Sequence, residues 1–217
     1  MSLEEAIREA IIEWDEEKLK EICRSSIEKK QLTAAELLKI IGTVMQYIGK
    51  QFEDEEIFLP ELVGSANVVK NTVDDVIDPI IKEAGESKET LGKVVIGTVE
   101  GDVHSIGKDL VGSFLFSNGF DVFNLGEEVP ASTFVDKAEE LGAQVIGLSS
   151  LLTMSMGFQR EVIKELNDRG LRDKYKVIIG GSPTSKEYAE EIGADGWADD
   201  AIEAVDLIKI LLGINNK

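Results

Sequence analysis

The feature that most constrains the fold is a change of rhythm near residue 90. Beyond this point, short apolar runs rich in β-branched residues alternate with stretches of helical periodicity. The apolar runs are Val94–Val99, Asp121–Leu125, Val145–Ser149, Lys176–Ile179 and a short one at 196–198. The helical stretches are about 106–118, 131–141, 156–168, 184–192 and 200–212. This alternation predicts an α/β fold in which residues 93–217 form a flavodoxin-like (Rossmann-type) parallel sheet of five strands with helices on both faces.

The first half shows helical periodicity and no alternation of the β type. Apolar residues recur at helical spacing over 3–14 and 15–30. Thr33 followed by Glu36 is a capping-box signature that opens a third helix, and Pro60 suits the first turn of a fourth, which Pro79 should kink or interrupt. We therefore expect a four-helix bundle over residues 1–84. The polar segment 85–92, with glycine at both ends, is the predicted linker.

The charge and cysteine content narrow the class of protein. A formal charge of −19 argues against nucleic acid and anionic membranes as partners. One cysteine, Cys23, forms neither an intramolecular disulfide nor a cysteine zinc cluster, which fits a reducing cytoplasm. The N-terminal sequence lacks the features of a signal peptide, and no apolar stretch approaches the roughly 18 residues of a membrane span. We expect a cytoplasmic protein.

Three polar segments follow predicted strands. They are residues 100–107 after the first strand, 149–155 after the third and 180–184 after the fourth. Because the carboxyl ends of parallel strands meet at one edge of a sheet, we expect these segments to lie together where such folds bind ligands. Together they supply one imidazole, one carboxylate, several hydroxyls and a glycine pair.

His104, the only histidine, lies two residues after Asp102. A nearby carboxylate can accept the second N–H of an imidazole, which orients the ring and makes its free nitrogen a better metal ligand. One histidine cannot hold a zinc ion, which needs three or four protein ligands. A tetrapyrrole-like macrocycle suits such a site better, because it brings most of its own coordination sphere and leaves axial positions open.

Each of these residues also has a purely structural interpretation. A lone histidine is most often a surface residue or a satisfied core residue. Ser149, Thr153 and Ser155 suit ordinary helix N-caps, and Gly180–Gly181 suits a tight turn after a strand. Only the combination of the three segments favours a ligand site.

That combination resembles the cobalamin-binding module of methionine synthase, the corrinoid-dependent methyltransferases and the B12-dependent mutases. The family signature is D-x-H-x-x-G, then S-x-L, then G-G. Here it is 102–107, then 149–151 after 41 residues, then 180–181 after another 28. Residues 51–62 resemble part of the helical cap of methyl-transferring members, with Glu55 where the family usually has glycine. The chain is most similar to the small corrinoid proteins of methylamine, methanol and aryl O-demethylation systems.

The resemblance implies roles for individual residues. His104 Nε2 is expected to be the lower axial ligand of cobalt in a base-off/His-on state. Asp102 is expected to bind the other ring nitrogen, and Ser155 to extend the pair into a proton-relay triad. Contacts to the displaced nucleotide tail are implied for Ser149, Thr153, Gly180 and Gly181. Phe58, Leu59 and Val63 are expected either to cover the upper face of the cofactor or to form bundle core. The other implied cofactor-binding residues are Gly101, Val103, Ser105, Ile106, Gly107 and Leu151.

The resemblance also implies a function. It implies a cobalamin or related corrinoid that cycles between cob(I) and methyl-cob(III), on a protein that does not turn over substrate alone. The expected partners are a substrate-specific methyltransferase, preferably for methylamines, an acceptor methyltransferase using coenzyme M or tetrahydrofolate, and a reductive activator protein. The alternatives are a B12-dependent regulatory sensor, the small subunit of a B12-dependent mutase, and a cofactor-free response-regulator-like domain.

Overall fold

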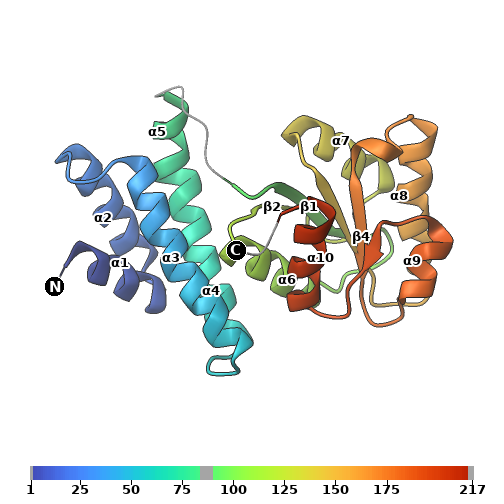
Figure 1. Cartoon of the computed structure of the whole chain (residues 1–217), viewed down its shortest axis with the longest axis horizontal. Coiled ribbons are helices and arrows are strands. Elements are labelled where there is room, and N and C mark those ends of the chain that lie inside the picture. Colours follow the sequence, from blue (N-terminus) through green and yellow to red (C-terminus); the bar gives the residue numbers. More distant parts are fainter. Residues whose placement is uncertain (1, 84–89, 215–217) are drawn as a thin grey trace. The chain divides into compact units, whose positions relative to one another are not determined.

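The computed structural model describes residues 2–83 and 90–214 (Figure 1). The chain divides into two compact units, one of Met1–Glu89 with Ser117–Gly119 and the other of Thr90–Phe116 with Phe120–Lys217. The linker proposed at 85–92 falls mostly outside the described residues. Within the described residues, no helix has the length and apolar character needed to cross a membrane.

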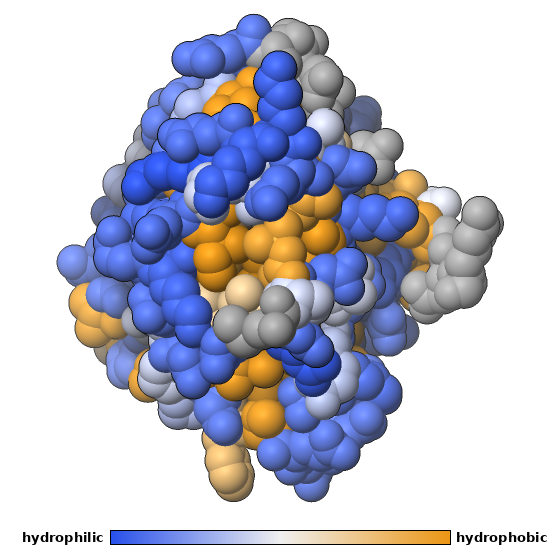
Figure 2. Space-filling view, turned by 90° about the vertical axis from the view of Figure 1, so that its left-hand side faces the viewer, coloured by the Kyte–Doolittle hydropathy of each residue, from blue (hydrophilic) through white to orange (hydrophobic). Residues whose placement is uncertain are grey.

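The first unit is helical, as predicted. Its elements are α1 (Leu3–Ile12), α2 (Glu16–Glu28), α3 (Ala34–Glu53), α4 (Leu59–Thr72), a π-helix (Val73–Ile77) and α5 (Asp78–Glu83). The predicted capping box opens α3, because the Thr33 hydroxyl accepts from the Glu36 N–H and the Glu36 carboxylate accepts from the Thr33 N–H. The face shown in Figure 2 is largely hydrophilic, with a hydrophobic patch near its middle.

The fourth predicted helix is interrupted just before Pro79, rather than at the proline itself. There α4 passes into the π-helix Val73–Ile77, and α5 begins at Asp78. The Asp78 N–H donates to Val73 O, five residues earlier. Proline has no N–H, and its ring clashes with the carbonyl four residues before it. The wider π-helical turn accommodates Pro79, so the helix continues almost without a break from α4 into α5.

The second unit is the predicted five-stranded parallel sheet, with the strand order β2-β1-β3-β4-β5. The strands are β1 (Lys93–Thr98), β2 (Asp121–Asn124), β3 (Val145–Ser149), β4 (Lys176–Gly180) and β5 (Gly196–Trp197). The helices are α6 (Ile106–Ser117), α7 (Ala131–Leu141), α8 (Met156–Asp168), α9 (Lys186–Ile192) and α10 (Ala201–Leu211). Helices α6 and α10 cover one face of the sheet, and α7, α8 and α9 cover the other (Figure 1).

The order of the strands positions the site. Strand β2 pairs with one side of β1, whereas β3 pairs with the other side and leads on to β4 and β5. Connections that leave β1 and β3 therefore diverge, and a crevice forms where they separate. The register pairs Thr98 with Ser149 and Ser149 with Gly180, so the ends of β1, β3 and β4 are level. The three polar segments thus emerge side by side.

Candidate functional site

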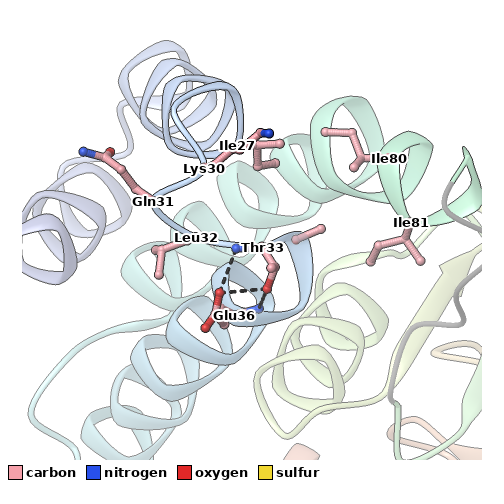
Figure 3. A pocket seen from close by; sticks show the side chains of 9 residues that line it. Ile27, Lys30, Gln31, Leu32, Thr33, Glu36, Ile80 and Ile81 are labelled. Carbon is pink, nitrogen blue, oxygen red and sulfur yellow. Dashed lines mark hydrogen bonds between the residues drawn. The ribbon is translucent and has the colours of Figure 1, made fainter.

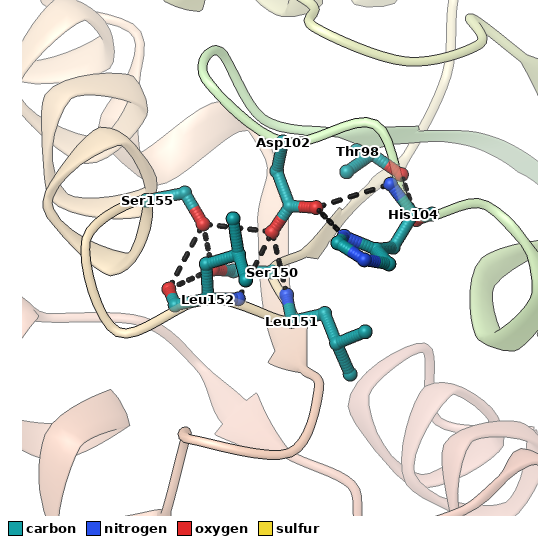
Figure 4. Close-up of polar contacts among 7 residues, drawn as sticks. All are labelled: Thr98, Asp102, His104, Ser150, Leu151, Leu152 and Ser155. Atoms are coloured by element: carbon teal, nitrogen blue, oxygen red, sulfur yellow. Dashed lines mark hydrogen bonds and ion pairs between the residues drawn. The ribbon is translucent and has the colours of Figure 1, made fainter.

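The imidazole of His104 is held by the carboxylate of Asp102 (Figure 4). The chain leaves β1, turns at Gly101 with φ +77, and buries Asp102 completely. Asp102 Oδ1 lies 2.7 Å from His104 Nδ1 and accepts from the His104 main-chain N–H at 3.1 Å. Thr98 Oγ1 donates to His104 O at 2.9 Å, which anchors the loop to the end of β1. Because a carboxylate only accepts, Nδ1 carries the proton and Nε2 is left with a free lone pair.

The second carboxylate oxygen is bound by the loop that follows β3. Asp102 Oδ2 accepts from the main-chain N–H groups of Leu151, at 2.7 Å, and Leu152, at 3.1 Å. It also accepts from the Ser155 hydroxyl at 2.7 Å. Burial by itself raises the pKa of Asp102, but the hydrogen bonds from Ser155, His104 and the main chain outweigh it and hold this pKa below its usual range. The group is therefore an ionised, fully coordinated carboxylate.

Ser155 occupies the position expected for the third member of the triad. Its residue is 1% exposed, and it lies at the N-cap of α8 without making a side-chain cap bond. Its hydroxyl instead lies within hydrogen-bonding distance of Asp102 Oδ2, Leu152 O and Ser150 Oγ. The ordinary helix-cap interpretation of this serine is therefore wrong. Ser150 was not among the predicted site residues, although its place next to Ser149 at the end of a strand predicts a side chain on the opposite face.

A pocket of about 450 Å³ opens beside this hydrogen-bonded group. It contains five of the predicted binding residues, namely Gly107, Ser149, Leu151, Gly180 and Gly181. Its walls are mainly apolar side chains from β1, β3, β4 and α6: Ile96, Leu110, Val111, Leu148, Ile178 and Ile179. Polar lining residues that the sequence did not suggest are Lys108, Ser182, Asp199 and Asp200. The mainly apolar walls of the pocket suit an extended, partly aromatic group.

Two glycines at this pocket are required by close backbone contacts. Gly181 has φ +112, and a Cβ on it would lie 1.9 Å from Ser150 O. A Cβ on Gly180 would lie 3.2 Å from Ala198 O. A Cβ on Gly107, in contrast, meets no atom within 4 Å and would occupy the open pocket. The tight-turn interpretation of Gly180–Gly181 and the ligand interpretation are thus compatible, because the turn itself shapes the pocket.

Other predicted residues lie apart from the pocket. Thr153 is exposed and does not line it. In the helical unit, Phe58 is 77% exposed, which rules out a bundle-core role for this residue, whereas Leu59 and Val63 are partly buried. The neighbouring core residue of α4 is Leu62, which is fully buried. That these three residues cover the cofactor stays a prediction.

Several exposed apolar side chains lie close in sequence to His104 or to the residues that bind Asp102, and the His104 side chain is itself 46% exposed. They come from its own loop and from the loop after β3, and they are Val103, Ile106, Leu151, Leu152 and Met154, with Met154 at 91%. The predicted polar neighbour Ser105 is partly buried. Exposed apolar side chains on the two loops that hold the imidazole suit a large, flat and largely apolar ligand.

The helical unit has a pocket of its own, of about 420 Å³ (Figure 3). It is lined by Ile27, Lys30, Gln31, Leu32, Thr33, Ala34, Glu36, Ile80 and Ile81. It adjoins the capping box of α3, and none of Phe58, Leu59 and Val63 lines it. In the described part of the chain, no group of three or more His, Cys, Asp and Glu side chains could hold a bare metal ion.

The chain matches two families of known domains and many individual proteins. Residues 92–206 match the B12 binding domain, and residues 3–86 match a second family that is also described as a B12 binding domain. A corrinoid protein of Desulfitobacterium hafniense is 40% identical over 98% of this chain and 99% of its own. Trimethylamine corrinoid protein 1 of Methanosarcina acetivorans is 39% identical over 94% of each chain.

The fold is also that of a solved structure. The methanol:cobalamin methyltransferase complex of Methanosarcina barkeri contains a chain that matches 99% of this one, over 81% of its own length, with a TM-score of 0.84 at 24% identity. The family matches and the relatives together cover both halves of the chain. This chain belongs to the family of B12-binding corrinoid proteins.

Proposed function

We propose that this protein is a methyl carrier whose corrinoid is bound through His104 Nε2. When bound, the corrinoid supplies a cobalt centre that takes up and releases a methyl group. The observation that carries the proposal is the buried Asp102 carboxylate, which receives five hydrogen bonds. Because this carboxylate takes the Nδ1 proton of His104, the lone pair of Nε2 is left to bind a metal. A ligand supported in this way is the usual arrangement for histidines that bind metals.

The pocket supports the base-off/His-on part of the proposal. If His104 takes the lower axial position, the nucleotide tail of the corrinoid must lie elsewhere. The pocket between β1, β3, β4 and α6 begins next to the His104 loop, and its Gly107, Gly180 and Gly181 leave room for a close-fitting group. Its apolar walls suit a planar base, and Ser149 and Ser182 offer hydroxyls to the polar part of the tail.

We further infer that methylamines are the methyl source. The trimethylamine corrinoid relative supports this assignment, because it covers nearly the whole chain without a large insertion or extra domain.

The carrier requires a substrate-specific methyltransferase to load it, an acceptor methyltransferase using coenzyme M or tetrahydrofolate to unload it, and a reductive activator. The exposed apolar side chains of the His104 loop and of the loop after β3 would contact the bound corrinoid. The buried Cys23 thiol suits the reducing cytoplasm to which we assign the protein.

Reconstitution tests the proposal directly. The purified chain is mixed with methylcobalamin, passed through a desalting column, and examined for cobalt content and visible absorption. We expect cobalt at about one equivalent and the spectrum of a corrinoid with a nitrogen lower ligand. In His104→Gly, we expect a changed axial-ligand spectrum that added imidazole restores. Asp136→Asn is the control, because it changes an exposed carboxylate of α7 that pairs with Arg169 and should leave the spectrum unchanged.

Two results would overturn the assignment. A nitrogen splitting in the electron paramagnetic resonance spectrum of the cob(II) form that does not change when histidine is labelled with ¹⁵N would show that the cofactor keeps its own base. An unchanged spectrum in His104→Gly would remove His104 as the ligand. The methyl source is tested separately, by supplying trimethylamine, dimethylamine or methanol with the corresponding methyltransferase and following methylation of the reduced, loaded carrier. Exclusive use of methanol would contradict the methylamine assignment while leaving the carrier role intact.

A further inference from the structure

A second buried hydroxyl lies behind the triad. Ser150 is 0% exposed, and its Oγ lies 2.7 Å from Ser155 Oγ and 3.2 Å from Leu152 O. The hydroxyls of Ser150 and Ser155 therefore form a chain that ends on Asp102 Oδ2 (Figure 4). Nothing in the predicted signature required a hydroxyl at position 150, since the motif there is S-x-L.

The number of hydroxyl protons limits how Ser150 and Ser155 can bond to their neighbours. Ser155 Oγ has one proton and two neighbours that only accept, the Asp102 carboxylate and Leu152 O. In one arrangement, Ser150 donates to Ser155, and Ser155 donates to the carboxylate. In a second, Ser155 donates to Ser150, which donates to Leu152 O. In a third, Ser150 donates to Ser155, and Ser155 donates to Leu152 O. In both of these the carboxylate loses a donor. The first is favoured because it ends on a charged acceptor, and each bond in such a chain polarises the next.

The main chain of Ser150 is fixed by the turn at the other end of the pocket. Its N–H donates to Gly180 O at 3.1 Å. Its carbonyl lies against Gly181, so closely that a Cβ there would be 1.9 Å away. The buried Gln159 amide also donates to Gly180 O, at 3.3 Å, and to Leu148 O, at 3.0 Å. Ser150 therefore touches both the glycine turn of the pocket and the hydroxyl that supports the carboxylate.

We propose that Ser150 is a positioning residue for His104, the fourth member of a hydrogen-bonded chain that runs from the glycine turn through Ser155 and Asp102 to the imidazole. It acts by directing the single Ser155 proton toward the carboxylate. The consequence for the ring is a weaker pull on its Nδ1 proton, because a carboxylate that receives a polarised hydroxyl shares less with its other donors. The proposal rests on the proposed function only in treating His104 as the ligand.

The test uses the cofactor-free protein and reads the ring of His104 by NMR. Since His104 is the only histidine in the chain, its ring ¹H and ¹⁵N signals need no assignment. At one fixed pH, Ser155→Ala should move the Nδ1 proton signal downfield. Ser150→Ala should move it in the same direction by roughly a tenth to a third as much, the size of cooperative strengthening along a chain. In the double variant, the loss of Ser150 should add nothing, because its effect passes through Ser155.

The matched control is Ser26→Ala in the helical unit. Ser26 is also a buried serine, 1% exposed, whose hydroxyl donates to a main-chain carbonyl at 2.7 Å. It should leave the ring signals unchanged. Unmoved signals in Ser150→Ala, or additive shifts in the double variant, would reduce Ser150 to a packing residue. Both outcomes are independent of cofactor binding, so they leave the carrier function untouched.

Discussion

Replacing Asp102 by asparagine should change which nitrogen of His104 carries the proton. The new amide keeps the shape of the carboxylate but presents one N–H₂ group. The main-chain N–H groups of Leu151 and Leu152 cannot change role, so the amide oxygen must face them. The amide nitrogen then faces His104, whose ring accepts at Nδ1 only by moving its proton to Nε2. The nitrogen proposed to bind cobalt would thereby lose its lone pair.

The cost in stability follows from the same five bonds. Four of them weaken from charge-assisted to neutral, at about 1 kcal/mol each, and the His104 main-chain N–H loses its acceptor, at about 1–3 kcal/mol. Relief from burying a charge returns part of this sum. We expect the free energy of unfolding of the cofactor-free protein to fall by about 3 kcal/mol.

Urea denaturation measures the stability, and ring ¹⁵N shifts measure the tautomer. The control is Asp136→Asn, which removes an exposed carboxylate paired with Arg169 and should change neither quantity appreciably. If Asp102→Asn unfolds at the same urea concentration as the wild type, the carboxylate is not the anchor described above. An unchanged tautomer would refute the proton count at the ring.

Two further predictions concern the same unit. Gly181→Ala should destabilise it by about 2–4 kcal/mol, because φ +112 strains an alanine and its Cβ would lie 1.9 Å from a carbonyl oxygen. Gly157→Ala, in open space on α8, should be neutral or stabilising. Equal urea midpoints for the two variants would contradict this contrast. Hydrogen bonds hold the pKa of Asp102 in the folded protein below its unfolded value. The stability that the ionised Asp102 contributes is therefore complete above about pH 4 and is lost as the pH falls toward its folded-state pKa. The wild type should lose more stability in acid than Asp102→Asn. Parallel loss of stability in the two proteins would argue against this role of the carboxylate.

Periodicity predicted the elements well because both halves are regular. The ends of the predicted strands and helices lie within about two residues of those observed. The helix interruption near Pro79 followed from the missing N–H, but its form as a π-helix did not, since that depends on the packing of the preceding turn. The parallel order of the strands predicted that the segments of Asp102 and Ser155, 53 residues apart, lie together, and the family resemblance implied that the two residues pair.

Contacts made by the main chain were beyond the reach of the sequence. No residue type reveals that the Leu151 and Leu152 N–H groups point at Asp102, because every residue except proline has the same donor.

The surroundings of the Lys108 side chain were also not predictable. Lysine is rarely buried, yet this side chain is 2% exposed and its ammonium is satisfied by Asp109 and Asn124. Such an arrangement depends on side chains brought together by the fold.

Because the order of the strands sets the crevice between the connections that leave β1 and β3, we expect this crevice to form in the cofactor-free chain. Synthesis of the polypeptide and delivery of its cofactor are therefore separable events. Newly made chains should reach their folded form at any level of B12 supply and wait as a store of empty carriers. A cell short of corrinoid would then be limited by loading, and a sudden supply could be used at once, without new protein synthesis.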